Sequence, residues 1–344
     1  MPESPPISLK QIADEAGVSA MTVSRVLRKS PQVSPDTRQR VLQAAERLGY
    51  RPDPHVTQLM EHVRRRRLTG QRATLAHVYD HPAAATDIHN YVSLEHIRAR
   101  ADGHGYRVDS FRLGPGGVSA RRLRDILRTR GIRGVLLSVN ALARTSTELD
   151  YSELATVTFG FGLDGPSLHR ASTNVTQGML DIFVQLESRG YRRIGMAITP
   201  WADQRAGHTY SGALLHHQQS LPVSRRLPML LLSSPEQEQN RLSFEAWMRK
   251  HRPDVLISVH EPVVHWLQNL GLNLPKDIGL LVHDWLPAMQ GLAGMDHRRP
   301  EVAAAAVDLL AAHLQHHEYG LPEVPRQILI PPAFIEGASL RPVT

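Results

Sequence analysis

Residues 8–49 show three short helical patterns with a tight glycine turn after the first. Ser8 and Gln11 have the spacing of a capping box, in which each side chain satisfies the other residue's main-chain N–H. Gly17 then ends the first helix, because glycine adopts the left-handed conformation found at helix C-termini. Ser34, followed directly by proline, begins the third helix. Three short helices with such a turn predict a helix-turn-helix unit.

The second helix of this unit carries the side chains expected to meet DNA. In a helix-turn-helix, the first residues of the second helix enter the major groove. Arg25 suits that place because its planar guanidinium can donate to both O6 and N7 of guanine. Ala20 and Met21 offer only apolar contact, for instance to a thymine methyl group. The alternative is a small helical bundle in which Arg25 is merely solvated, but the agreement of several signals favours DNA binding.

Positive charge is concentrated in the same part of the chain. Residues 1–72 contain 13 Lys+Arg and 7 Asp+Glu, a balance of +6. The remaining residues contain 27 Lys+Arg and 26 Asp+Glu, a balance of +1. A basic segment joined to a nearly neutral body is typical of a polyanion-binding head on a body with another task.

Several classes of protein are made less probable by what the sequence lacks. Cysteine is absent, which excludes disulfides, thiol catalysis and cysteine-based metal sites. No long apolar run predicts a membrane span, and the first ten residues do not resemble a secretory signal. His260 and His265 miss the spacing of a zinc-protease motif by one residue. We therefore expect a cytoplasmic protein with no cofactor, no metal and no membrane partner.

Residues 53–72 form the connection between head and body. Val56 and Leu59 start an apolar stripe at helical spacing, which should pair with a second copy of the chain or with DNA. A plain linker helix is the alternative. Four arginines follow, Arg64 to Arg67, and they either hold DNA phosphates or are simply solvated.

From residue 73 the chain alternates short apolar runs with helical patterns. This alternation predicts parallel, doubly wound sheets, and the number of elements suits two subdomains. The expected helices lie near residues 92–103, 119–130, 176–189, 235–250, 262–270 and 300–316. Ligands of such sheets bind beyond the carboxyl ends of the strands. That rule nominates Asp80, Asn140, Phe161, Trp201, His260 and Asp284.

The stretches IADEAGVSAMTVSRVL and VSPDTRQRVLQAAERLGYRP resemble the head of the lactose-repressor (LacI/GalR) family over residues 8–52. The resemblance implies that Ala20, Met21 and Arg25 read bases. It also implies that the head is positioned on DNA phosphates by Ser19, Thr22, Ser24 and Tyr50. The family usually has a polar residue where Met21 stands, so the operator sequence cannot be copied from relatives.

The same resemblance extends to the hinge and the body. Leu59 matches the family's leucine that wedges into the minor groove, although the stretch between Leu59 and the first strand of the body is longer than usual by about two helical turns. LESRGYRRIGMAI, LNLPKDIGLLVHD and FIEGASLRP are similar to the family's effector domain, which is itself similar to periplasmic sugar-binding proteins. Asp284 then falls on the ligand-binding aspartate, while Trp201 and Trp285 could stack on a sugar ring.

Two positions of the body depart from the family pattern. Thr209 stands where the family has an arginine, although Arg205 lies nearby, and His260 with the following glutamate replaces an Asn-Asp pair. Arg205 and His260 therefore remain candidates for effector binding, and the ligand need not be a usual sugar. A DNA-binding protein that has lost its effector response is a further alternative.

Together these features predict three segments. Residues 1–52 form the helix-turn-helix domain, 53–72 the hinge helix with the arginine-rich linker, and 73–344 the effector-binding and dimerisation domain. Within the last, the expected N-subdomain is about 73–162 plus 296–322, and the C-subdomain about 163–295 plus 323–344.

The expected protein is a ligand-responsive transcription regulator and a repressor. It would bind a near-palindromic operator as a homodimer and take a small metabolite, such as a carbohydrate, as effector. Whether the ligand releases or promotes DNA binding cannot be read from the sequence. The competing class, a metabolic enzyme such as a sugar kinase with a DNA-binding head, lacks a convincing phosphate loop.

Overall fold

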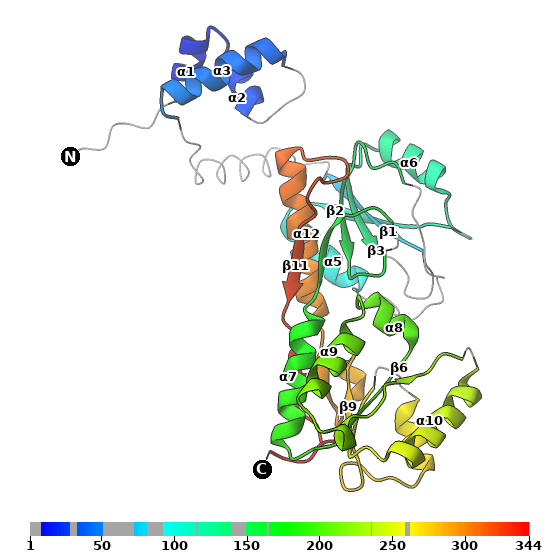
Figure 1. The fold of residues 1–344 in the computed structure, drawn as a ribbon. Coiled ribbons are helices and arrows are strands. Elements are labelled where there is room, and N and C mark those ends of the chain that lie inside the picture. Colours follow the sequence, from blue (N-terminus) through cyan, green and yellow to red (C-terminus); the bar gives the residue numbers. More distant parts are fainter. Residues whose placement is uncertain are drawn as a thin grey trace, which may run out of the picture.

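A computed structural model describes most of the chain. The described residues are 8–27, 33–50, 72–80, 92–114, 116–138, 149–163, 165–234, 236–258 and 262–343. They form a small helical head and a body with two sheets (Figure 1). Within these residues, no helix is both long enough and apolar enough to cross a membrane.

The head consists of α1 (Leu9–Ala16), α2 (Ala20–Leu27) and α3 (Pro35–Arg47). The three helices share one small core, and each contributes buried side chains to it. These are Ile12, Ala13, Ala16, Val23, Val26, Val41, Ala44 and Ala45. The helical spacing of apolar residues in the sequence is therefore the spacing that builds this core.

The predicted caps of the head are confirmed. The Gln11 main-chain N–H donates to Ser8 Oγ (3.3 Å), and the Ser8 N–H donates to Gln11 Oε1 (2.8 Å). Gly17 has a φ of 64°, so it ends α1 in the left-handed conformation. Ser34 Oγ accepts from the Thr37 N–H at the start of α3 (3.3 Å). Local side chains thus satisfy main-chain groups that the helices leave open.

The first sheet has the strand order β11-β5-β4-β3-β1-β2, and all neighbouring pairs are parallel. In chain order its strands are β1 (Thr74–Tyr79), β2 (Arg107–Arg112), β3 (Gly134–Ser138), β4 (Ala155–Phe159), β5 (His169–Thr173) and β11 (Gln327–Ile330). Its helices are α5 (Leu94–Gly103), α6 (Ala120–Thr129) and α12 (Arg299–His316). We call this unit the N-subdomain.

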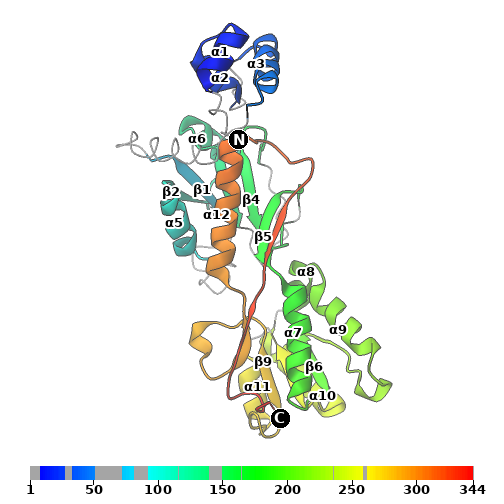
Figure 2. The same cartoon turned by 90° about the vertical axis from the view of Figure 1, so that its left-hand side faces the viewer.

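The two faces of the first sheet have separate cores. Leu75 packs with α5 and α12, whereas the next residue, Ala76, packs with α6. Because successive side chains of a strand point to opposite faces, α6 covers one face and α5 and α12 cover the other. Both views of the ribbon agree with this layering (Figures 1 and 2).

The second sheet has the order β12-β10-β9-β8-β6-β7. In chain order its strands are β6 (Ile194–Ile198), β7 (Leu230–Leu231), β8 (Val255–Ser258), β9 (Gly279–Val282), β10 (Ala293–Asp296) and β12 (Ala333–Ile335). Its helices are α7 (Val175–Ser188), α8 (Pro200–Arg205), α9 (Thr209–Gln219), α10 (Gln237–His251) and α11 (Val263–Asn269), with short 3₁₀ turns at η2 (Val223–Arg225) and η3 (Pro287–Met289). We call this unit the C-subdomain.

The predicted architecture of two doubly wound sheets is confirmed, with one exception to parallel pairing. β12 pairs with β10 in antiparallel fashion. Only Pro331 and Pro332 separate β11 from β12, so the chain leaves the first sheet and enters the second without reversing direction. Entering from the carboxyl edge, it runs against the other strands of the second sheet.

The chain passes between the sheets later than the expected boundaries. β5 and β11 both hydrogen-bond within the first sheet, although residues 163–295 and 323–344 were expected in the C-subdomain. β5 is polar for a strand, with the sequence HRAST, and therefore gives no apolar run. Its place follows from pairing with β4 on one side and β11 on the other.

Three crossing segments lie side by side between the subdomains (Figure 2). The Asn174 N–H, directly after β5, donates to the carbonyl of Ile330 at the end of β11 (2.8 Å). Thr173 Oγ1 donates to the carbonyl of His297, directly after β10 (2.8 Å). The three crossings are thus bonded to one another at the point where the subdomains meet.

Candidate DNA-reading helix and inter-subdomain site

The solvent face of α2 presents the residues that were predicted to read DNA. Val23 and Val26 point into the head core, while Ala20, Met21 and Arg25 are exposed. Met21 is 65% exposed, so its side chain is accessible to a ligand. Within the described residues Arg25 makes no ion pair, so its guanidinium is available to a ligand.

The residues predicted to position the head lie around the start of α2 and after α3. Ser19 Oγ accepts from the Thr22 N–H (3.1 Å) and lies 2.9 Å from Thr22 Oγ1, so the two side chains cap the helix together. Ser24 is half-buried on α2. Tyr50 donates its main-chain N–H to Ala45 (2.9 Å) and packs partly against the head core.

The hinge predictions cannot be compared with the structure. Val56, Leu59 and the run Arg64 to Arg67 lie outside the described residues. The same holds for Asn140 and His260 among the effector candidates.

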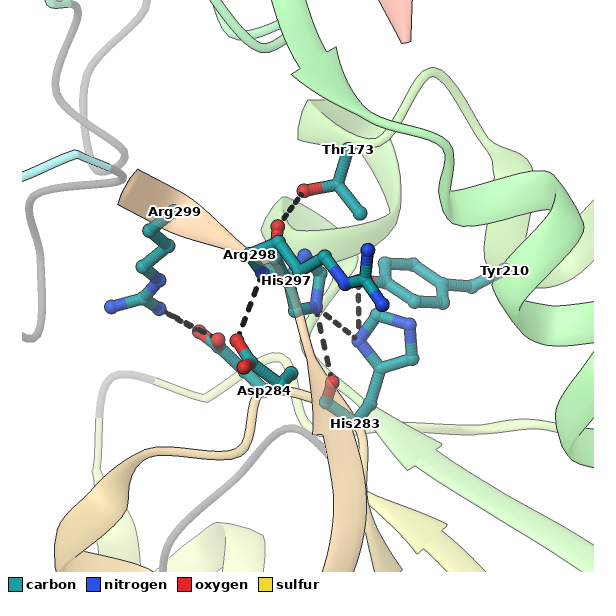
Figure 3. A network of polar contacts seen from close by, with 8 residues as sticks. Thr173, Tyr210, His283, Asp284, His297, Arg298 and Arg299 are labelled. Atoms are coloured by element: carbon teal, nitrogen blue, oxygen red, sulfur yellow. Dashed lines mark hydrogen bonds and ion pairs between the residues drawn. The ribbon is translucent and has the colours of Figure 1, made fainter. Parts of the chain in front are cut away.

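Asp284 is held by an ion pair that the sequence did not predict. It follows β9, and both of its carboxylate oxygens accept from Arg299 Nη2, at 2.6 and 2.8 Å (Figure 3). Arg299 is the first residue of α12, whose other side chains pack in the N-subdomain. The pair therefore joins the strand end of one subdomain to the helix of the other. Asp284 keeps 39% of its side chain exposed, so solvent still reaches it.

A buried polar cluster lies beside this ion pair. His283 and His297 are 0% and 5% exposed, and Tyr210 of α9 reaches them from the side (Figure 3). His297 Nε2 is 3.0 Å from the His283 carbonyl, which can only accept, so this nitrogen carries a proton. His283 Nδ1 lies 3.3 Å from that nitrogen and 2.9 Å from the Tyr210 hydroxyl oxygen.

Burial disfavours the charged form of both histidines of the cluster. Burial holds the pKa of His283 well below its usual range, and the neighbouring His297 lowers it further. Burial also lowers the pKa of His297, while Asp284 acts in the opposite direction. His283 Nε2 has no hydrogen-bond partner in the part of the chain that the structure describes.

Arg205 brings the two subdomains together at a second point. It is the last residue of α8, and its guanidinium stacks over the Trp201 ring at 5.2 Å. A Cβ placed on Gly162, in the loop after β4, would lie 3.3 Å from Arg205 Cγ. Phe161 in the same loop is covered by Arg170, whose guanidinium lies 4.8 Å from the ring centre. Trp201 and Arg205 therefore lie beside the loop that carries Phe161.

The remaining two described candidates have different surroundings. Asp80 follows β1 at the carboxyl edge of the first sheet, as predicted. Trp285 donates its ring N–H to the Leu292 carbonyl (3.2 Å) and its main-chain N–H to Met295, so it packs on its own loop. A bonded and packed indole is a poorer platform for a ligand than a free face.

Sequence reasoning missed Arg299, His283, His297 and Tyr210. A signal was present for two of them, since His283 and His297 each stand at the end of a strand of the second sheet, where the strand-end rule applies. Arg299 gave none, because the segment DHRRPEV gives no sign of which arginine turns inward. Within the described residues, no group of histidines and carboxylates is arranged to hold a metal ion.

Two family descriptions match separate parts of the chain. Residues 8–53 match "Bacterial regulatory proteins, lacI family", and residues 183–340 match "Periplasmic binding protein-like domain". The first covers the helical head, and the second covers most of the C-subdomain together with α12 and β11.

Curated relatives match chiefly through the head. The HTH-type transcriptional regulator GalS of Salmonella typhimurium is 51% identical over 57 residues, which is 17% of each chain. The sucrose operon repressor of Escherichia coli is 59% identical over 46 residues, 13% of this chain and 14% of that protein. The regulator MalR of Streptomyces coelicolor is 30% identical over 199 residues, 56% of this chain and 54% of its own. The matched region thus spans about half the length of these relatives, or less.

Solved structures share the fold of the whole chain. The complex of the transcriptional regulator CelR with cellobiose has a TM-score of 0.57 at 18% identity, covering 97% of this chain and 99% of that one. The lac repressor dimer bound to operator and the anti-inducer ONPF has a TM-score of 0.55 at 16% identity, with the same coverage. At such identities the likeness concerns the fold alone.

A helix-turn-helix head joined to a two-sheet body of the periplasmic-binding-protein type defines a class of bacterial regulators. The chain has a helix-turn-helix head of the lacI family and a periplasmic-binding-protein-like domain, and its curated relatives are LacI/GalR-type transcription regulators. Members of this family are regulators and not enzymes, so the competing sugar-kinase interpretation is set aside.

Proposed function

We propose that this chain is a sequence-specific repressor whose affinity for operator DNA is set by a small metabolite. The observation that carries the proposal is the exposed face of α2, where Ala20, Met21 and Arg25 stand clear of the head core. Such a face has no packing role in the head, and its place at the start of the second helix is the place that reads bases.

Arg25 supplies the hydrogen-bonding part of base recognition, and Ala20 and Met21 the apolar part. Ser19, Thr22, Ser24 and Tyr50 position the head on phosphates. The operator is near-palindromic, since two heads of a homodimer present α2 twice with a two-fold relation. The relatives that support this include a lac repressor solved as a dimer on operator. DNA as target also supports a cytoplasmic location.

The proposed segments follow the sequence: a DNA-binding domain at 1–52, a hinge with its arginine-rich linker at 53–72, and an effector and dimerisation domain at 73–344. In the hinge, Val56 and Leu59 are assigned to the minor groove. Insertion of an apolar side chain there unstacks a base step, a cost recovered by the contacts that the bent duplex makes.

The effector site is assigned to the meeting edge of the two subdomains. We assign Asp284 to it as the anchor, together with Arg205, Trp201, Phe161, Asp80, Asn140, His260 and Trp285. A solved relative, CelR, is described in complex with cellobiose, which supports a carbohydrate or a similar polyhydroxylated metabolite. A hydroxyl group that donates to Asp284 would compete with Arg299 for the carboxylate oxygens.

That competition gives the effector a route to the head. Arg299 begins α12, and α12 runs through the N-subdomain core toward the end of the body where the chain enters from the hinge (Figure 2). Loss of the Asp284–Arg299 pair would change how the C-subdomain holds α12. The angle between subdomains, and with it the spacing of two hinge helices, then differs between the free and the bound protein.

The base-reading assignment is tested by selecting duplexes from a random pool with the full-length protein. Arg25→Ala is expected to lose preference for the selected operator by about 10- to 100-fold, in line with about 1–3 kcal/mol for a bidentate contact, while weak binding to any duplex remains. Arg40→Ala, an exposed arginine on α3, is the matched control and should keep the preference. Equal affinity of parent and Arg25→Ala for operator and random DNA would refute the assignment.

The effector assignment is tested by a thermal-shift screen of sugars and other metabolites, followed by operator binding with and without each hit. Asp284→Asn is expected to abolish the response, and it should spare operator binding because the Asn amide oxygen can still accept from Arg299 Nη2. Asp181→Asn, an exposed carboxylate on α7, is the control. A response that survives in Asp284→Asn would remove this residue from the site.

A further inference from the structure

The solvent face of α6 is lined with arginine. On this helix Leu123 and Leu127 are buried against the first sheet, and Ser119 caps the start by accepting from the Arg122 N–H (3.2 Å). The opposite face carries four exposed arginines: Arg121, Arg122, Arg124 and Arg128. Two more, Arg130 and Arg133, are exposed just beyond the helix.

This is an unusual accumulation of charge for the body of the protein. Residues 119–133 contain six arginines and one aspartate, a balance of +5, whereas the rest of residues 73–344 has 21 Lys+Arg and 25 Asp+Glu, a balance of −4. The body as a whole is nearly neutral only because these two regions cancel. A local excess of this size creates a positive field at one place on the surface.

Few carboxylates neutralise the arginines of α6. Arg124 pairs with Asp125, its neighbour in sequence, at 3.3 Å, and both side chains are about half exposed. Within the described residues Arg121, Arg122 and Arg128 make no ion pair. An exposed pair such as Arg124–Asp125 contributes little and exchanges readily with another anion.

The topology places this face at the end of the body where the hinge enters. α6 connects β2 to β3, two parallel strands, so it runs antiparallel to them. Its last turn, with Arg128, therefore lies at the amino edge of the sheet, where Thr74 begins β1 after the hinge. Both views of the structure show α6 at the end of the N-subdomain farthest from the C-subdomain (Figures 1 and 2).

We propose that the arginine face of α6 contacts the phosphate backbone of duplex DNA outside the base pairs that the head covers. Operator DNA, the proposed target of the head, is a polyanion that complements this positive face. Because the body is covalently linked to the head, it stays near DNA that the head has bound. A tethered contact of this kind is intramolecular, so even weak ion pairs are populated at the high effective concentration. The arginines would lengthen the footprint and steepen its salt dependence without adding sequence preference.

The size of the effect follows from counterion release. Each phosphate neutralised on duplex DNA contributes about 0.9 to the slope of log K against log salt. Three contacts would thus change the slope by about 2.7, which is about 40-fold in affinity over a fourfold change in salt. An effect of that size is easily separated from the error of a binding titration.

The experiment compares two duplexes, a selected operator of minimal length and the same operator extended by about 15 base pairs on each side. One variant replaces Arg121, Arg122, Arg124 and Arg128 by glutamine in the full-length protein. A second variant, Arg128→Glu, changes one residue only and reverses its charge. Operator affinity is measured across a salt series. Thermal unfolding checks that each variant folds, which glutamine on an exposed helix face should permit.

The expected result is a shallower salt slope, by about 2–3, for the fourfold variant on the extended duplex, with no change on the minimal one. The matched control removes four exposed charges from the C-subdomain by changing Arg192, Arg225, Arg249 and Lys250 to glutamine. It should behave as the parent on both duplexes.

Three outcomes would overturn the proposal. One is an unchanged slope on the extended duplex, as expected if α6 is merely solvated or binds an acidic protein instead. Another is an equal decrease of the salt slope in the C-subdomain control, which would indicate a general effect of net charge. The third is an equal decrease of the salt slope for the fourfold variant on the minimal duplex, which would place the contact within the operator.

Discussion

The hydroxyl of Thr173 donates a hydrogen bond to the carbonyl of His297 over 2.8 Å, joining two of the three segments that cross between the subdomains. Thr173 ends β5, and His297 lies between β10 and α12, so residues far apart in sequence are bonded at the crossing point. Thr173 is 1% exposed. A buried bond of this kind fixes how one crossing segment lies against the next, and so restricts the angle between the subdomains.

Replacing Thr173 with valine keeps the shape of the side chain and removes the donor. The His297 carbonyl then loses this bond in a buried place, which we expect to lower the free energy of unfolding by about 1–3 kcal/mol. Urea denaturation of the full-length chain would show this as a lower midpoint. Thr173→Ser retains the hydroxyl and should stay near the parent, whereas equal midpoints for parent and Thr173→Val would contradict the role of the bond.

The buried histidines make stability depend on pH. Burial holds the pKa of His283 well below its usual range and lowers that of His297. Burial lowers the pKa of His169 to about 4. In the unfolded chain all three return to about 6.5, so unfolding takes up protons below that pH. We therefore expect the stabilising contribution to be complete above about pH 6.5 and to be lost as the pH falls.

Thermal unfolding at pH 7.5, 6.5 and 5.5 measures this dependence. The unfolding temperature should fall as the pH is lowered over this range. Asp308 and Glu318 have lowered pKa values and also stabilise the fold, but their contribution to stability is lost only at lower pH. His169→Asn removes one of these imidazole groups, so its unfolding temperature should fall less. The Asn amide oxygen can still accept from the Arg326 N–H, as His169 Nδ1 does at 2.9 Å. His316→Asn, an exposed control, should leave the fall unchanged. A flat profile for the parent would disprove the prediction.

The sequence predicts the head well because its signals are local. Ser8 and Gln11 are three residues apart, and Gly17 acts on its own helix, so neither requires knowledge of the rest of the fold. The exposed face of α2 follows in the same way, since Val23 and Val26 fix which side of the helix is buried. Periodicity alone therefore places Met21 and Arg25 on the surface.

The body is predicted only as far as its apolar runs extend. β5 has no apolar run and β12 is only three residues long, and their pairing depends on partners that arrive from distant parts of the chain. The ion pair of Asp284 with Arg299 joins residues whose contact depends on how two subdomains are placed. Strand-end reasoning finds Asp284, but nothing in the local sequence distinguishes Arg299 from the arginine before it.

Gly17 offers a test of the head's local design. Its φ of 64° is unfavourable for any residue with a Cβ, and no atom lies within 4 Å of where that Cβ would be. Gly17→Ala should therefore cost only the backbone term, about 1–2 kcal/mol, in the unfolding of the head. Gly103→Ala is the control, because Gly103 also has open space but lies in the last turn of α5 without a positive φ, so alanine there should be neutral or slightly stabilising. Calorimetry of the full-length chain would report both changes, and equal effects at the two glycines would argue against the backbone explanation.

Met21 should determine one position of the operator. Its side chain is 65% exposed on α2 and is not part of the head core, so Met21→Gln is expected to leave folding unchanged. Glutamine can both donate to N7 and accept from N6 of adenine, which methionine cannot do. Selection from a random duplex pool should then enrich adenine at one base pair of each half-site, with about 10- to 100-fold discrimination against the parent's base, in line with about 1–3 kcal/mol for such a contact. Met21→Leu keeps the apolar character and should select the parent's operator. If Met21→Gln also selects that operator, Met21 does not face a base, and recognition rests on Arg25 and the phosphate contacts.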